Sequence, residues 1–138
     1  MEKDIRVSFI VSEDIQSQSL QNSPLAKTII INPIFIMRTK WIPTTLSLGI
    51  TIITSGIDFS KEHDVQITLI NRTSGITIYD TGKTNINIPG GNADNFNFAV
   101  ELKNMDFEDE GFYDMVLVVD GKTYSDYFKV LKIDDSKH

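Results

Sequence analysis

Between residues 44 and 55, apolar and polar side chains take turns along the chain. The apolar set consists of Leu46, Leu48, Ile50 and Ile52, and the polar or small set consists of Thr45, Ser47, Gly49 and Thr51. A repeat of two residues is that of a β-strand, whose successive side chains point to opposite faces. We therefore predict a strand with one face in a hydrophobic core, and such a face needs a second layer to cover it.

The amino-acid composition favours an all-β domain. The 138 residues include 20 Ile, 8 Val and 12 Thr, which pack well on a pleated sheet, but only three Ala, the best helix former. Other alternating segments follow, with turn signals roughly 8–12 residues apart. We predict an immunoglobulin-like β-sandwich of about seven to nine antiparallel strands, forming a single domain over residues 1–138.

Three segments depart from the simple alternation. Residues 12–24 are polar and aperiodic, so we expect a loop there, and we expect residues 134–138 to be a disordered tail. Residues 26–37 are apolar on both sets of alternate positions, as in a strand covered on both faces. Pro33 lies inside this last segment and cannot donate to a ladder, so we place it at a sheet edge, a bulge or a break.

Two short motifs agree with this architecture. Residues 109–113 have the order Asp, x, Gly, x, Tyr of a tyrosine corner, in which the Tyr hydroxyl binds backbone upstream of it. Asp120 and Gly121 predict a two-residue hairpin turn. Met115 stands where an antibody domain has its second disulfide Cys, and Trp41 precedes the alternating strand. We interpret the corner as a folding device of a sandwich that is not an antibody domain.

Charge and composition exclude several classes of protein. With 13 Lys and Arg against 19 Asp and Glu, the net charge of −6 disfavours binding to nucleic acid and to anionic membranes. The absence of Cys removes disulfides, thiolate metal sites and a cysteine nucleophile. No segment resembles a membrane span or a secretory leader, so we expect a cytoplasmic protein, the alternative being export by a route that leaves no cleavable signal. We expect no cofactor.

An acidic segment is the candidate metal site. It contains Asp106, Glu108, Asp109 and Glu110, whose carboxylates are the kind of ligand that calcium takes. The spacing is not that of a calcium-binding helix–loop–helix, and a sandwich site would need acids from a second loop. The other acids are scattered, and include Asp58, Glu62, Asp64, Asp80 and Asp94. A solvated acidic turn is the preferred interpretation, and we assign no metal.

The candidate binding residues are Arg38, Lys40 and Trp41, which place two cations beside an aromatic ring. Such a group can stack on and pair with nucleic acid or a carboxylated ligand, although one such group in an acidic protein is a weak signal. The structural alternative is that Trp41, next to Pro43, is a lid on the core.

Candidates for catalysis are scarce. His63 lies among Lys61, Glu62 and Asp64 in a predicted loop without a nucleophile motif, and the other His is residue 138. A catalytic His63 would need a deep pocket and a carboxylate within hydrogen-bond reach. We therefore expect a protein that is not an enzyme.

Three segments, taken together, carry a resemblance. Residues 5–14 are a short strand that ends in an acidic turn, and residues 29–35 and 43–53 are two apolar strands. Residues 111–122 contain Gly-Phe-Tyr and Val-Val-Asp-Gly-Lys. This order resembles a family of small bacterial proteins of unknown function. The resemblance implies a single β-sandwich, an intracellular location and an origin in chromosomes or prophage-like regions, and it implies no activity or site residues.

These observations predict a non-catalytic binding or assembly module. Exposed sheet edges pair readily with other chains, so the expected partner is another protein or a second copy in a homodimer. The alternative is an acidic-loop domain that binds calcium or another ligand.

Overall fold

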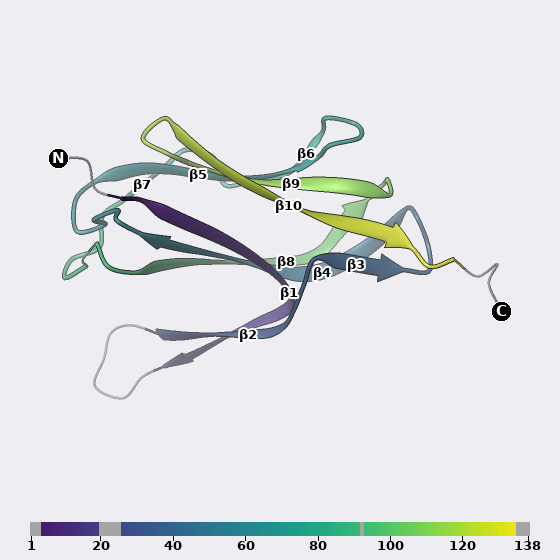
Figure 1. Cartoon of the computed structure of the whole chain (residues 1–138), viewed down its shortest axis with the longest axis horizontal. Coiled ribbons are helices and arrows are strands. Elements are labelled where there is room, and N and C mark those ends of the chain that lie inside the picture. Colours follow the sequence, from purple (N-terminus) through teal and green to yellow (C-terminus); the bar gives the residue numbers. More distant parts are fainter. Residues whose placement is uncertain (1–3, 20–25, 92, 135–138) are drawn as a thin grey trace.

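The computed structural model describes residues 4–19, 26–91 and 93–134. Within these residues the chain forms ten β-strands and no helix (Figure 1). This part of the chain therefore contains no helix that could cross a membrane. The strands are β1 (Arg6–Ser19), β2 (Ala26–Ile34), β3 (Ile36–Thr39), β4 (Thr44–Ser55), β5 (His63–Asn71), β6 (Thr77–Asp80), β7 (Thr84–Ile86), β8 (Phe96–Phe107), β9 (Gly111–Val119) and β10 (Lys122–Lys132). The all-β prediction is confirmed, and the strand count exceeds the predicted seven to nine. Of the tail expected at residues 134–138, residues 135–138 lie outside the described residues.

The strands form two sheets that share one hydrophobic core. The first sheet has four strands in the order β2-β1-β4-β8, and the second has six, in the order β3-β10-β9-β5-β6 with β7 also paired to β5. The first sheet contributes Val11, Leu48, Ile50, Ile52, Val100, Leu102 and Phe107 to the core. The second contributes Val65, Ile67, Leu69, Tyr113, Met115, Leu117, Val119, Phe128 and Val130, and the β4–β5 loop adds Ile57 and Phe59. Burial of this shared apolar surface is the main force holding the two sheets together.

The apolar set predicted for β4 lies in this core. Leu48, Ile50 and Ile52 are at most 3% exposed. The opposite face is only partly exposed, because Gly49 and Thr51 are buried there. Gly49 marks a close approach between strands, since a Cβ at this position would overlap the side chain of Ile15 in β1.

The loop predicted for residues 12–24 is wrong for residues 12–19. These residues continue β1, and they pair with β2 in a register that runs from Val11 opposite Ile34 to Ser19 opposite Ala26. The polar residues give no hydrophobic alternation to detect. The backbone ladder to the apolar β2 holds this segment extended, so tertiary pairing overrides its low strand propensity. The rest of the predicted loop, residues 20–24, lies outside the described residues.

The apolar segment 26–37 is divided between the two sheets. β2 is an edge strand of the first sheet and includes Pro33, and the chain then crosses at Phe35 to β3 in the second sheet (Figure 1). β3 pairs parallel to β10, which corrects the expectation that all strands are antiparallel. The expectation of a strand covered on both faces is also wrong, because Phe35 and Ile36 are exposed. A proline is tolerated in β2 because an edge strand needs fewer ladder donors.

Both predicted motifs are present at the two ends of β9. The hydroxyl of Tyr113 donates a hydrogen bond to the backbone carbonyl of Asp109, at 2.6 Å, and the Tyr113 side chain is fully buried. Asp120 and Gly121 have φ angles of 48° and 83°. Both angles are positive, as a two-residue hairpin turn of type I′ requires.

Candidate functional site

The predicted group of Arg38, Lys40 and Trp41 lies on and just after β3, at the edge of the six-stranded sheet. All three side chains are exposed, and Trp41 is 71% exposed, so the interpretation of Trp41 as a core lid is wrong. β3 is a four-residue strand at the edge of its sheet, and Trp41 lies two residues beyond its end. None of the three lines the apolar cleft between β1 and β10.

The predicted acidic group does not converge on one point. Asp109 accepts a hydrogen bond from the side-chain amide of Asn71, at 2.8 Å, and Glu110 accepts one from the backbone N–H of Lys132, at 2.6 Å. Asp106 and Glu108 are exposed. Among the described residues, no three His, Asp or Glu side chains are arranged to hold a metal ion. Two of the four carboxylates thus hold loops and strand ends together.

His63 has the carboxylate that a catalytic histidine would need. Its Nδ1 atom lies 2.6 Å from Oδ2 of Asp120, and its Nε2 atom lies 2.8 Å from the backbone carbonyl oxygen of Asp58. Asp120 also accepts the backbone N–H of Asp64 through Oδ1, at 2.9 Å. The ring packs edge-on against Phe59, with centroids 5.3 Å apart. The site ties the β9–β10 turn to the start of β5 and to the preceding loop.

The protonation chemistry of His63 follows from these two contacts. Both ring nitrogens face oxygen acceptors, and only the doubly protonated ring donates to both. The hydrogen bond to Asp120 raises the pKa of His63, against burial, which lowers it. The same hydrogen bond, with that from the Asp64 N–H, lowers the pKa of Asp120. The arrangement favours a charged pair rather than a general base with a nitrogen free for substrate.

A cavity of about 380 Å³ adjoins this pair. Its lining includes Lys61, Lys122 and Tyr124 besides His63 and Asp120. No Ser, Thr or Cys is among the described residues that line it, so the pair has no aliphatic hydroxyl or thiol beside it to activate.

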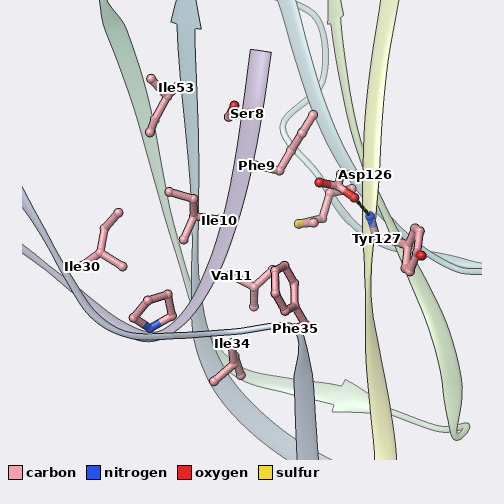
Figure 2. A pocket seen from close by; sticks show the side chains of 12 residues that line it. Ser8, Phe9, Ile10, Val11, Ile30, Ile34, Phe35, Ile53, Asp126 and Tyr127 are labelled. Carbon is pink, nitrogen blue, oxygen red and sulfur yellow. Dashed lines mark hydrogen bonds between the residues drawn. The ribbon is translucent and has the colours of Figure 1, made fainter.

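A larger cleft lies elsewhere, on the side of the molecule where β1 faces β10 (Figure 2). Its volume is about 640 Å³ and its lining is mostly apolar. The lining residues are Ser8, Phe9, Ile10 and Val11 of β1, Ile30, Pro33 and Ile34 of β2, Phe35 of the crossover, Ile53 of β4, Met115 of β9, and Asp126 and Tyr127 of β10. The backbone that carries Phe35 runs across one end of the cleft (Figure 2).

Exposed apolar side chains gather near this cleft and along β3. Six large apolar residues of the described chain are well exposed, namely Phe35, Ile36, Trp41, Ile76, Tyr127 and Ile133. Phe35 and Tyr127 line the cleft, and Ile36 and Trp41 lie on or just after β3. The backbone N–H of Ile133, just after β10, donates a hydrogen bond to the carbonyl of Thr39 in β3. Two of the six therefore border the cleft and three lie along β3, and exposed apolar surface of this kind is typical of binding sites.

None of the sequence motifs predicts this cleft. The available signal was an interruption of alternation: Ile10 and Ile53 are apolar at positions where the pattern calls for polar residues. Both line the cleft. The second signal is the run of apolar residues within 26–37, the segment predicted to be a strand covered on both faces. This segment supplies Ile30, Ile34 and Phe35 to the cleft.

Comparison with solved structures gives a number of distant likenesses, which include two different enzymes. A β-glucosidase from Listeria innocua in complex with isofagomine aligns with 94% of this chain and 16% of its own length, at 8% identity and a TM-score of 0.44. The alkylpurine DNA glycosylase AlkC from Pseudomonas fluorescens, bound to DNA containing an abasic site analogue, aligns with 89% of this chain and 30% of its own length. There the identity is 10% and the TM-score 0.42. Likenesses of this degree carry no argument about function.

Family membership rests on a different comparison. No curated protein matches this chain. The model of a family of unknown function, DUF6941, matches residues 26–128, and the chain therefore belongs to that family.

Proposed function

We propose that this protein is a non-catalytic binding or assembly module that engages another polypeptide through the open side between β1 and β10. The observation that carries the proposal is the apolar cleft of about 640 Å³ on that side, with Phe35 88% exposed at its border. Apolar surface of this kind is costly to leave in water, and in a folded protein it marks a place where a partner binds.

The proposal includes an immunoglobulin-like sandwich as the scaffold. β4 and β8 are neighbours in one sheet, and β10, β9, β5 and β6 are successive neighbours in the other. This order matches strands B and E of one sheet, and strands G, F, C and C′ of the other, in variable-type immunoglobulin domains. The tyrosine corner at the start of β9 supports the same assignment.

Catalysis and metal binding are left out of the proposal for specific reasons. Both nitrogens of His63 are bound to acceptors, and two of the four acids of the candidate metal site already hold other groups. No observation favours the alternative of a calcium-binding domain. The cytoplasmic location and the bacterial or prophage origin stay predictions.

The proposal can be tested by placing a photo-cross-linking amino acid at single positions. We would introduce it at Phe35, beside the cleft, and at Ile76, an apolar residue that is 63% exposed in the β5–β6 turn. Irradiation in the native host should give discrete adducts from position 35 that are absent from position 76. An adduct of twice the monomer mass identifies a second copy. If position 35 gives no adduct, or the same adducts as position 76, the open side is not the binding surface.

A further inference from the structure

Two strand edges beside the cleft have no neighbouring strand among the described residues. β1 pairs with β4 along residues 6–12, but β2 joins its other side only from Val11 onward. β10 pairs with β9 along residues 122–130, but β3 joins its other side only from Lys129 onward. Residues 6–10 and 122–128 therefore each keep one edge unpaired, and both segments supply lining residues to the cleft (Figure 2).

The two edges differ in what their backbone can still bind. Every second N–H and C=O of a strand points to the same edge. On β10, the N–H of Tyr127 already donates to Oδ1 of Asp126, at 2.8 Å (Figure 2). A carboxylate placed in this way protects a sheet edge from pairing. Residues 6–10 of β1 have no such cap from within the described part of the chain, so β1 is the edge that can accept a further strand.

The side chains around β1 suit an extended segment. The edge of residues 6–10 is about 17 Å long at roughly 3.4 Å per residue, enough to pair with about five residues of a partner. Such a strand would direct every second side chain toward Phe9, Ile34 and the other apolar groups of the cleft. It would lie beside β1 just where β2 departs, and so continue a pairing that the chain already makes.

Charge distinguishes the kind of partner. Asp126 is the one charged residue among the twelve that line the cleft, and the whole chain carries a net charge of −6. An occupant with a Lys or Arg near Asp126 is therefore favoured electrostatically, whereas a second copy brings another −6 to the contact.

We propose that the cleft receives an extended apolar segment of another polypeptide, carrying at least one Lys or Arg, which adds to the sheet as a strand paired with residues 6–10 of β1. This inference rests on the proposed function and names its partner class. Main-chain hydrogen bonds to β1 would supply affinity, and the apolar cleft and Asp126 would supply specificity.

The test starts from random peptides of about ten residues displayed on phage and selected on the purified protein. The selected sequences should alternate apolar residues and contain Lys or Arg. A synthetic selected peptide should protect backbone amides of residues 6–10 from hydrogen exchange. N-methylation of the alternate peptide amides that point toward β1 should weaken binding about tenfold, because each methyl group removes a hydrogen-bond donor. N-methylation of the amides that point away from β1 should weaken binding much less.

Matched variants place the binding in the cleft. Phe35→Ser should weaken the peptide about tenfold, whereas Ile76→Ser, at the exposed control position, should leave its affinity unchanged. Asp126→Asn keeps an oxygen for the Tyr127 N–H but removes the charge, and it should abolish the selection for Lys and Arg.

Three results would overturn the strand-addition inference. The first is a selection that yields no peptide binding better to the protein than to its Phe35→Ser variant. The second is equal weakening of binding by N-methylation of either set of alternate amides, which means that the peptide binds without pairing as a strand with β1. The third is sedimentation of the free protein as a dimer with the same amides protected, which makes a second copy the occupant. In each of these three cases, photo-cross-linked adducts from position 35 that are absent from position 76 would still support the proposed binding function.

Discussion

The two ends of β9 are held in place by different physical means. At its start, the hydroxyl of the fully buried Tyr113 donates to the partly buried carbonyl of Asp109, and this tie consists of neutral groups. At its end, Asp120 binds the ring of His63 where the Asp120 side chain is 50% exposed and the His63 side chain 20% exposed. We refer to these contacts as the tyrosine tie and the histidine tie.

The difference shows what each kind of contact can do. A buried neutral hydrogen bond keeps its strength at any pH at which both groups stay neutral, and burial raises the pKa of Tyr113 above its ordinary value of 10.0. An ion pair near water is weaker and depends on the proton concentration. One strand therefore has a permanent attachment at one end and a conditional attachment at the other.

Removing the tyrosine tie should have the largest effect. We expect Tyr113→Phe to lower the free energy of unfolding by about 1–3 kcal/mol, because the partly buried carbonyl of Asp109 loses its donor. The loss should be the same at pH 5.5 and pH 8.5 in urea unfolding. The control is Tyr127→Phe, whose side chain is half exposed and should change stability by less than about 0.5 kcal/mol. Equal losses in the two variants would refute the role of the tyrosine tie.

The histidine tie should give a smaller effect that depends on pH. The pKa of His63 is raised on folding, so its contribution is fully present below the ordinary value of 6.5 and is lost as pH rises through the raised value. We expect His63→Gln to cost about 0.5–1 kcal/mol at pH 5.5, a modest figure because Asp120 is half exposed. The cost should shrink toward zero at alkaline pH. Wild-type and variant stabilities that run parallel from pH 5.5 to 9 would show that His63 titrates as it does in the unfolded chain.

The smallest effect is expected in the middle of β9, where Arg72 pairs with Asp114 on the outer face of the sheet. Arg72 also lies over the ring of Phe112, 4.5 Å from its centroid. We expect Arg72→Gln to destabilise by less than half as much as His63→Gln at pH 5.5, and by still less in 1 M NaCl, since salt screens exposed charges. A larger, salt-independent loss would mean that stacking on Phe112 outweighs the ion pair.

Much of the core could be predicted from the sequence because it follows a local rule. The alternation of β4 and β9 depends only on neighbouring positions, and the Asp120-Gly121 turn depends on two residues that tolerate positive φ. The tyrosine corner is likewise encoded within five residues. Local patterns of this kind need no knowledge of the partner strands.

The remaining features depend on pairing between distant residues. His63 and Asp120 are 57 positions apart, and nothing around either residue specifies the other. Residues 12–19 form a strand only because β2 lies beside them. Phe59 looks like part of a charged loop but is fully buried in the core. The cleft needs β1, the crossover and β10 together, so no single segment reveals it.

The crossover at Phe35 has a consequence for how the open side can widen. At that end, β2 and β3 are joined covalently, so the separation of the two sheets there is fixed by the length of three residues. At the far end, Ile5 just before β1 and Tyr124 of β10 border the cavity beside His63 and Asp120. The two ends of the open side therefore differ: one is closed by the covalent crossover between the sheets, whereas the other adjoins the histidine tie, which joins the β9–β10 turn to the start of β5 within one sheet.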